Sequence, residues 1–164
     1  MISYVTGLEI ESLSARLDKM VPGRKLDDNA VIMLNYKGGA KGVYWCSQIA
    51  WGHDNDLNFR IYGTEGAISW RQEECNYLKI AKKGENVKIS SRGRDAYYEH
   101  PGSYVRIPSG HPEGYFEALA NIYSTFIEAV TIKKEGGTPT DEQLDFPKPS
   151  DGAAGVKFIE KCVE

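Results

Sequence analysis

The sequence lacks any regular pattern of cysteines. Its three cysteines, Cys46, Cys75 and Cys162, are odd in number, and no two of them have Cys-x-x-Cys spacing. This argues against a disulfide framework and against a zinc site, and it favours a reducing compartment. We therefore expect a cytoplasmic protein without a structural metal.

Long apolar runs and an excess of positive charge are missing as well. No apolar stretch is long enough to span a membrane, and the first residues do not resemble a signal peptide. The net charge of −3 provides no attraction to nucleic acid or to an anionic membrane. The 164 residues, with 41% hydrophobic and 26% charged side chains, are typical of one globular domain with its own core.

The first half of the chain is typical of short strands joined by glycine-containing turns. Apolar patterns predict strands over residues 8–17, 30–36, 42–51, 57–62, 67–70, 76–81 and 86–90. Residues 63–66 have neither the spacing of a phosphate-binding loop nor a following helix, so we interpret them as a hairpin turn. Because no helical pattern separates the strands, we predict one antiparallel sheet in an α+β fold.

The second half predicts two helices. The first carries an apolar stripe at helical spacing and ends at residues 136–137, which are both glycine. The stripe consists of Tyr115, Leu119, Ile122, Tyr123, Phe126 and Val130. The second helix is predicted to begin near Asp151, as its N-cap, and to continue to the last residue without a capping signal. Its predicted buried residues are Val156, Ile159 and Val163.

Both faces of the strands predicted at 30–36 and 42–51 carry apolar side chains. A sheet with one face in solvent should alternate more clearly between apolar and polar residues. Two helices can cover only one face, so we expect the other to pack against a further surface. Our first expectation is the sheet of a second subunit, and the second is a domain that this chain does not contain.

A loop over residues 93–112 leads into the first helix and offers candidate ligand-binding residues. The N-terminus of a helix attracts anionic or polyhydroxyl ligands through its free N–H groups and its dipole. His111, directly before the helix, would hydrogen-bond a hydroxyl or carboxylate, and Arg106 would clamp such groups. The alternatives are a solvated histidine and a surface arginine stacked on Tyr104. A hydrolase built on this loop has no GxSxG elbow to support it.

The run Trp-Gly-His-Asp-Asn-Asp at residues 51–56 is the other candidate. It lacks the further acidic ligands of a calcium loop and the additional ligands of a zinc site. We interpret it as a polar turn whose Trp51 and His53 contribute to a substrate pocket.

Three motifs, taken in order and spacing, resemble the C-terminal domain of the Gfo/Idh/MocA oxidoreductases. They are Ile-Tyr-Gly-Thr-Glu-Gly at 61–66, Gly-His-Pro-Glu-Gly-Tyr at 110–115 and Asp-Gly at 151–152. The resemblance extends over nearly all of residues 1–164. It implies an open, predominantly antiparallel sheet with helices on one face, as in the C-terminal domain of glyceraldehyde-3-phosphate dehydrogenase. It also implies a homodimer or tetramer formed through the sheet face.

The same resemblance implies that the intact protein transfers a hydride between NAD or NADP and a sugar, cyclitol or related polyol. The Gly-rich fingerprint and Glu-Lys-Pro motif of the family's Rossmann domain do not occur in this sequence, and Lys148 is not that lysine. Residues 2–7 resemble the end of the helix that carries the family's Asp-x-x-x-His motif, which would lie upstream of Met1.

We therefore expect a fragment of a longer enzyme that is inactive alone. On this interpretation the chain has no catalytic, cofactor-binding or metal-binding residues, and no cofactor binds it by itself. Its expected contribution to substrate binding comes from His111, Arg106, His53 and Trp51. The alternative is a stand-alone module that binds a ligand or dimerises without catalysis.

Overall fold

Every strand pairing in the computed structural model is antiparallel over the residues that it describes, 1–94 and 104–164. These residues divide into two units: Met1–Asp54 with Lys148–Glu164, and Asn55–Pro147. The predicted α+β class and the antiparallel pairing are confirmed. The strands, however, form two hydrogen-bonded sheets and not one. Local hydrogen bonds from Trp51 N to Ile49 O and from His53 N to Ala50 O turn the chain after the third strand, so the ladder ends there.

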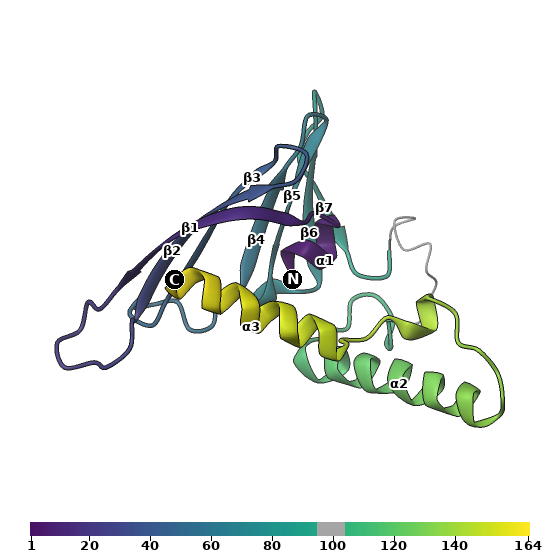
Figure 1. The fold of residues 1–164 in the computed structure, drawn as a ribbon. Helices are drawn as coiled ribbons and strands as arrows, with labels where there is room; N and C mark the ends of the chain where they lie inside the picture. Colours follow the sequence, from purple (N-terminus) through teal and green to yellow (C-terminus); the bar gives the residue numbers. More distant parts are fainter. Residues whose placement is uncertain (95–103) are drawn as a thin grey trace. The chain divides into compact units, whose positions relative to one another are not determined.

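The first unit consists of a three-stranded sheet and two helices (Figure 1). Its elements are α1 (Ile2–Thr6), β1 (Ile10–Asp18), β2 (Asn29–Tyr36), β3 (Lys41–Ser47) and α3 (Pro149–Val163). The predicted helical end at residues 2–7 is confirmed, because α1 ends at Gly7, whose φ of 67° is left-handed. Gly38 and Gly39, with φ of 83° and 94°, form the turn between β2 and β3.

One face of β2 forms the core of the first unit. Its alternate residues Ala30, Ile32, Leu34 and Tyr36 are buried, as the two-residue period of a strand requires. The side chains packed against this cluster come from α1, β1, α3 and the segment between α1 and β1: Ile2, Leu8, Leu13, Ala15, Phe158 and Cys162. Both helices of this unit therefore cover the same face of its sheet, whereas the first of the two predicted helices, α2 (Tyr115–Lys134), belongs to the other unit.

The face of α3 that contacts the core is not the predicted one. Phe158 and Cys162, one helical turn apart, pack on the sheet, and the ring of Phe158 meets Tyr44 edge-on at 6.3 Å between centroids. The predicted residues, Val156, Ile159 and Val163, are instead 57%, 64% and 69% exposed. They lie on another side of the helix, so the apolar pattern identified a helix surface that this chain leaves uncovered.

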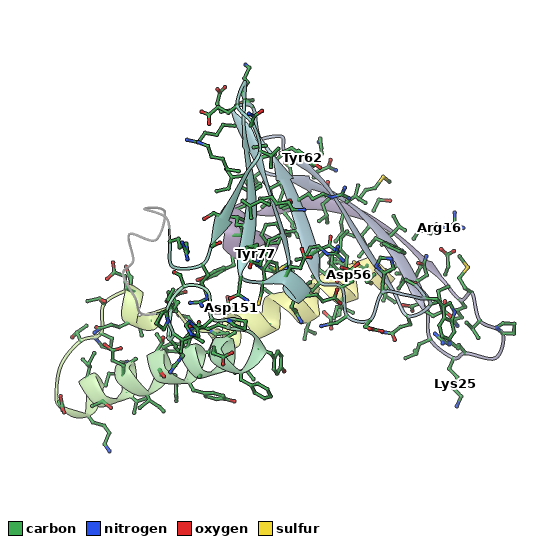
Figure 2. The ribbon with its side chains drawn as sticks, turned by 180° about the vertical axis from the view of Figure 1, so that it is seen from behind. Arg16, Lys25, Asp56, Tyr62, Tyr77 and Asp151 are labelled. Carbon is green, nitrogen blue, oxygen red and sulfur yellow. The ribbon has the colours of Figure 1, made fainter. Side chains whose placement is uncertain are left out.

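The N-cap of α3 is Lys148, and not Asp151 as predicted. Pro149 occupies the first helical position, where its fixed φ suits the helix and its missing N–H costs nothing. Asp151 lies two residues further on, and its carboxylate accepts a hydrogen bond of 2.7 Å from the Lys148 backbone N–H. Asp151 is labelled in Figure 2.

The second unit begins with a four-stranded meander and continues into a long helix (Figure 1). Its elements are β4 (Asn58–Tyr62), β5 (Gly66–Arg71), the 3-10 turn η1 (Gln72–Glu74), β6 (Tyr77–Lys82), β7 (Lys88–Ser91), α2 (Tyr115–Lys134) and the 3-10 turn η2 (Glu142–Leu144). The predicted hairpin turn is confirmed by a 2.7 Å hydrogen bond from Gly63 N to Gly66 O. Of the predicted loop over 93–112, residues 95–103 lie outside the described part of the chain.

Helix α2 ends as predicted, with Gly136 at φ 82° and Gly137 N donating to Ile132 O at 2.8 Å. Much of its apolar surface is exposed, although Phe126 meets Phe146, just after η2, edge-on at 5.4 Å. No helix in the described residues is both long and apolar enough to cross a membrane.

Candidate functional site

A cavity of about 150 Å³ lies in the second unit at the N-terminal end of α2. Its lining residues are Cys75, Asn76, Arg92, Tyr104, Glu113, Gly114, Glu117, Ala118 and Asn121. Pockets that enclose a complete small molecule are usually larger, roughly 300–1,000 Å³. The cavity therefore has room for one part of a ligand, in a polar setting.

A buried ion pair forms one wall of the cavity. Arg92 Nη1 lies 3.1 Å from Glu113 Oε1, and the two side chains are only 14% and 5% exposed. The other nitrogens of the guanidinium are also engaged: Nε donates to Asn76 Oδ1 at 2.9 Å, and Nη2 donates to His111 O at 2.6 Å. Nη1 additionally donates to Ile107 O at 3.1 Å. One guanidinium thus joins four residues.

Asn76 connects this ion pair to the sheet. Its Nδ2 donates to Glu113 O at 2.8 Å, and its Oδ1 accepts a hydrogen bond of 3.0 Å from Glu113 N. Cys75, the preceding residue, donates its thiol to the same carbonyl of Glu113 at 3.1 Å. The backbone of Glu113 is therefore fixed by the two residues that precede β6.

The segment of residues 104–114, here called the α2-entry loop, is held by these side chains and not by regular secondary structure. Oε1 of Glu113 accepts hydrogen bonds of 2.6 Å from the backbone N–H groups of both Arg106 and Ile107. Because backbone groups away from water need partners, a single carboxylate here takes the place of a strand or turn.

Glu117 caps the N-terminus of α2. Its Oε2 accepts a hydrogen bond of 2.8 Å from Gly114 N, three residues earlier. That bond is the main cause that lowers the pKa of Glu117, and the charges of Arg106 and Arg92 lower it further. The cavity wall thus carries Arg92, Glu113 and Glu117, and Arg106 lies close enough to act on Glu117, so that two positive and two negative charges balance.

The structure places the predicted residues Arg106 and His111 on the α2-entry loop, beside the cavity but not among the residues that line it. Arg106 is held against α2, because its Nε donates to Asn121 Oδ1 at 2.7 Å and its Nη2 to Ser124 Oγ at 2.9 Å. The His111 side chain is exposed, with Nδ1 lying 3.3 Å from Pro108 O.

The other two predicted residues lie in the first unit, in the turn after β3. Trp51 is 96% exposed, and the following Gly52 has a φ of 86°. His53 N donates to Ala50 O at 3.1 Å and closes the turn. The four predicted residues thus lie in two places: Arg106 and His111 on the α2-entry loop of the second unit, and Trp51 and His53 in the turn after β3 of the first unit. Within residues 1–94 and 104–164, no cluster of three or more His, Cys, Asp or Glu side chains could hold a metal.

Reasoning from the sequence missed most of the cavity wall. Glu113 belongs to the motif that was singled out, but its buried carboxylate was not foreseen. Glu117 had a usable signal, since an acidic residue three positions after a helix start is typical of a cap. Asn76 and Arg92 had none, because their partner Glu113 is 37 and 21 positions away in sequence.

Comparisons with known proteins identify relatives of this domain. The GFO/IDH/MocA C-terminal domain model matches residues 1–69. The crystal structure of an oxidoreductase from Sinorhizobium meliloti is 41% identical with a TM-score of 0.91, over 98% of this chain and 45% of that one. An inositol dehydrogenase homolog from Azotobacter vinelandii, complexed with NADH and myo-inositol, is 32% identical with a TM-score of 0.86, over 99% of this chain and 44% of that one.

A curated protein, the uncharacterized oxidoreductase YfiI of Bacillus subtilis, is 32% identical over 138 residues, which are 84% of this chain and 35% of that protein. The fold is thus an α+β domain built on antiparallel sheets, like that of the solved relatives. The chain belongs to the Gfo/Idh/MocA family as a C-terminal domain. It spans less than half the length of these relatives.

Proposed function

We propose that the protein containing this chain is an NAD- or NADP-dependent oxidoreductase that acts on a sugar, a cyclitol or a related polyol. The observation that carries the proposal is the likeness of 99% of the chain to an inositol dehydrogenase homolog complexed with NADH and myo-inositol. In this proposal the chain contributes part of the substrate site, and the remainder of the protein binds the cofactor. The isolated chain is then inactive.

The electrostatics of the cavity support a neutral substrate. Arg92 is paired with Glu113 at 3.1 Å, and the positive charges of Arg106 and Arg92 act on Glu117. With two positive and two negative groups in mutual contact or close by, little net charge is left to attract a carboxylate or phosphate. A hydroxyl-rich ligand can instead exchange hydrogen bonds with donors and acceptors of both kinds.

His111 and Arg106 contribute to substrate binding from the α2-entry loop in this proposal. The imidazole of His111 is exposed, and the guanidinium of Arg106 is oriented by two hydrogen bonds to α2. Trp51 and His53 contribute from the turn after β3, where the 96% exposed indole of Trp51 offers a flat apolar surface. Aromatic rings of this kind combine a large contact area with a polar edge.

The protein assembles, in our proposal, as a homodimer or tetramer through the uncovered face of the first sheet. The apolar residues on this face are Val31, Met33, Val43 and Trp45, which are 36%, 59%, 74% and 60% exposed. They form two directly opposed pairs, Val31 with Trp45 and Met33 with Val43. A contiguous apolar patch on a sheet face is typical of an interface between protein surfaces, and a second copy supplies the same patch.

The test uses the full-length protein, assayed for NADH formation from NAD and for NADPH formation from NADP, with myo-inositol and a panel of sugars. We expect turnover with at least one of these polyols. His111→Ala should raise the Michaelis constant of that polyol about fivefold, the equivalent of one hydrogen bond of roughly 1 kcal/mol, and leave that of NAD unchanged. Lys25→Ala, on the β1–β2 loop (Figure 2), is the control.

Absence of turnover with every polyol and both cofactors would contradict the proposed reaction. Unchanged kinetics in His111→Ala would remove this residue from the substrate site. An immunoblot of the source cell adds an independent check, since a band near 18.3 kDa would leave only a binding or dimerisation module.

A further inference from the structure

The α2-entry loop is attached to the sheet through one edge of a β-hairpin. Asn76 precedes β6 and Arg92 follows β7, and Arg92 N donates to Asn76 O at 2.9 Å, next to the paired residues Tyr77 and Ser91. The two side chains that hold the loop therefore come from adjacent points on one ladder. A side chain anchored in this way has little freedom to move relative to the sheet.

The contacts of Arg92 are distributed along the loop. Its guanidinium reaches the carbonyl of Ile107, the carbonyl of His111 and the carboxylate of Glu113. Ser109 adds a hydrogen bond from its Oγ to Arg92 O at 3.2 Å. Arg92 of the hairpin therefore binds the α2-entry loop both near its middle and near its end.

Glu113 performs the complementary task. The carboxylate that neutralises Arg92 also accepts the N–H groups of Arg106 and Ile107 at 2.6 Å. With side-chain exposures of 14% and 5%, neither partner is well hydrated, so each requires the other. Removing Glu113 leaves a buried charge on Arg92 and frees the N–H groups of Arg106 and Ile107. Removing Arg92 leaves a buried carboxylate without the partner that holds it and frees the carbonyls of Ile107 and His111.

We propose that Arg92, paired with Glu113 and anchored by Asn76, is the positioning residue of the substrate site. It transfers the fixed geometry of the β6–β7 hairpin to the α2-entry loop and so sets where Arg106 and His111 present their side chains. This inference rests on the proposed function for its catalytic consequence. Its structural part, the ordering of the loop, can be measured without any substrate.

The planar fork of the guanidinium is essential to this role. Nε, Nη1 and Nη2 point to different partners, and the ammonium group of a lysine cannot reproduce that geometry. Arg92→Lys, which keeps the charge, should therefore behave much like Arg92→Met. Glu113→Gln keeps the shape of the side chain but removes the charge, so it should have the same effect on the loop.

The experiment compares these three variants in the full-length protein by amide hydrogen exchange and by steady-state kinetics. The matched control is Arg71→Met, which breaks an ion pair of 3.0 Å with Asp56 in the same unit, at a side chain that is 49% exposed. The N–H groups of Arg106 and Ile107 should exchange faster by about 25-fold if two hydrogen bonds worth roughly fivefold each are lost. Exchange in β5 should not change, and the control should resemble the wild type.

The steady-state kinetics test whether Arg106 and His111 are correctly positioned to bind the polyol. We expect kcat/KM for the polyol to fall at least about tenfold in Arg92→Lys, with the Michaelis constant of NAD unchanged, because roughly one to two hydrogen bonds are misplaced. Adding guanidinium ions to an Arg92→Ala variant should restore part of the lost activity.

Unchanged amide exchange in the α2-entry loop would overturn the inference, and so would wild-type kinetics in Arg92→Lys. Faster exchange spread uniformly over β4–β7 would also overturn it, because it would indicate a purely structural role of Arg92. A wild type without polyol turnover would refute the proposed function. In that case the exchange data alone would decide whether Arg92 orders the loop.

Discussion

The two faces of β2 should respond very differently to the same kind of truncation. Ile32 is 3% exposed and lies in the core cluster with Leu34 and Tyr36. Ile32→Ala removes three carbon atoms, which at about 0.8 kcal/mol for each buried methylene gives about 2.4 kcal/mol. The cavity left behind raises the expected loss in the free energy of unfolding to about 3–4 kcal/mol.

Met33, the next residue along the strand, points to the other face and is 59% exposed. Met33→Ala therefore loses less than half of a buried side chain, and we expect at most about 1 kcal/mol. For a chain of this size, each kcal/mol moves the Tm by roughly 2–4 °C. The Ile32 variant should then melt roughly 6–16 °C below the wild type, and the Met33 variant within about 4 °C of it.

Thermal unfolding followed by circular dichroism measures the first difference, and size-exclusion chromatography with light scattering measures assembly. Met33→Lys should shift the protein toward the monomer, because it places a charge in the proposed interface, whereas Ile32→Ala should not do so at temperatures where it is folded. Equal destabilisation by the two alanine variants would refute the assignment of the core to one face. An unchanged oligomer in Met33→Lys would refute the sheet-face interface.

Two further predictions concern the second unit. Folding lowers the pKa of Glu117, so the unfolded chain binds a proton at a higher pH than the folded chain does. The stabilisation from this cap is therefore complete above the unfolded-state pKa. It is lost as the pH falls through the folded-state pKa. Melting temperatures over an acid pH series should accordingly fall less steeply in Glu117→Gln than in the wild type. Gly66→Ala should cost about 1–3 kcal/mol in urea unfolding, because its Cβ would lie 2.4 Å from the backbone oxygen of Ala81. Gly63→Ala, whose Cβ would have its nearest neighbour at 3.6 Å, should be close to neutral, and similar costs for both variants would contradict this reasoning.

Much of the fold was predictable because its signals are local. The continuous apolar run at 30–36 predicted β2 to within one residue, and glycines marked the turns at 37–39 and 63–66. The long helix followed from the spacing of its apolar residues, and its end from Gly136 and Gly137. Each of these features depends on residues within a few positions of one another.

The errors concern features that depend on distant partners. An apolar pattern at Val156, Ile159 and Val163 shows that a helix has an apolar side, but it cannot show which side meets the sheet. The side that meets the sheet is the one that carries Phe158 and Cys162, which contact a core formed by residues more than 100 positions earlier. The division into two sheets likewise depends on backbone hydrogen bonds after β3 that no side-chain pattern reports.

The candidate site was predictable only in part, for the same reason. The motif at 110–115 pointed to the end of α2 where the cavity lies, and to His111 on the loop beside it. The residues that hold the α2-entry loop in place, Asn76 and Arg92, come from the β6–β7 hairpin. An arginine followed by glycine in a polar stretch looks like any surface residue until its carboxylate partner is placed against it.

The first unit is assembled from two separate stretches of chain, Met1–Asp54 and Lys148–Glu164. During synthesis on the ribosome, the strands of its sheet are made before Asn55–Pro147, and Phe158 and Cys162 of α3 are made after it. Ile32, Leu34 and Tyr36 therefore lack the cover that α3 provides while the whole of Asn55–Pro147 is translated. A nascent or prematurely terminated chain would expose this apolar strand on the side that α3 covers in the folded protein, and an exposed apolar strand of this kind favours aggregation.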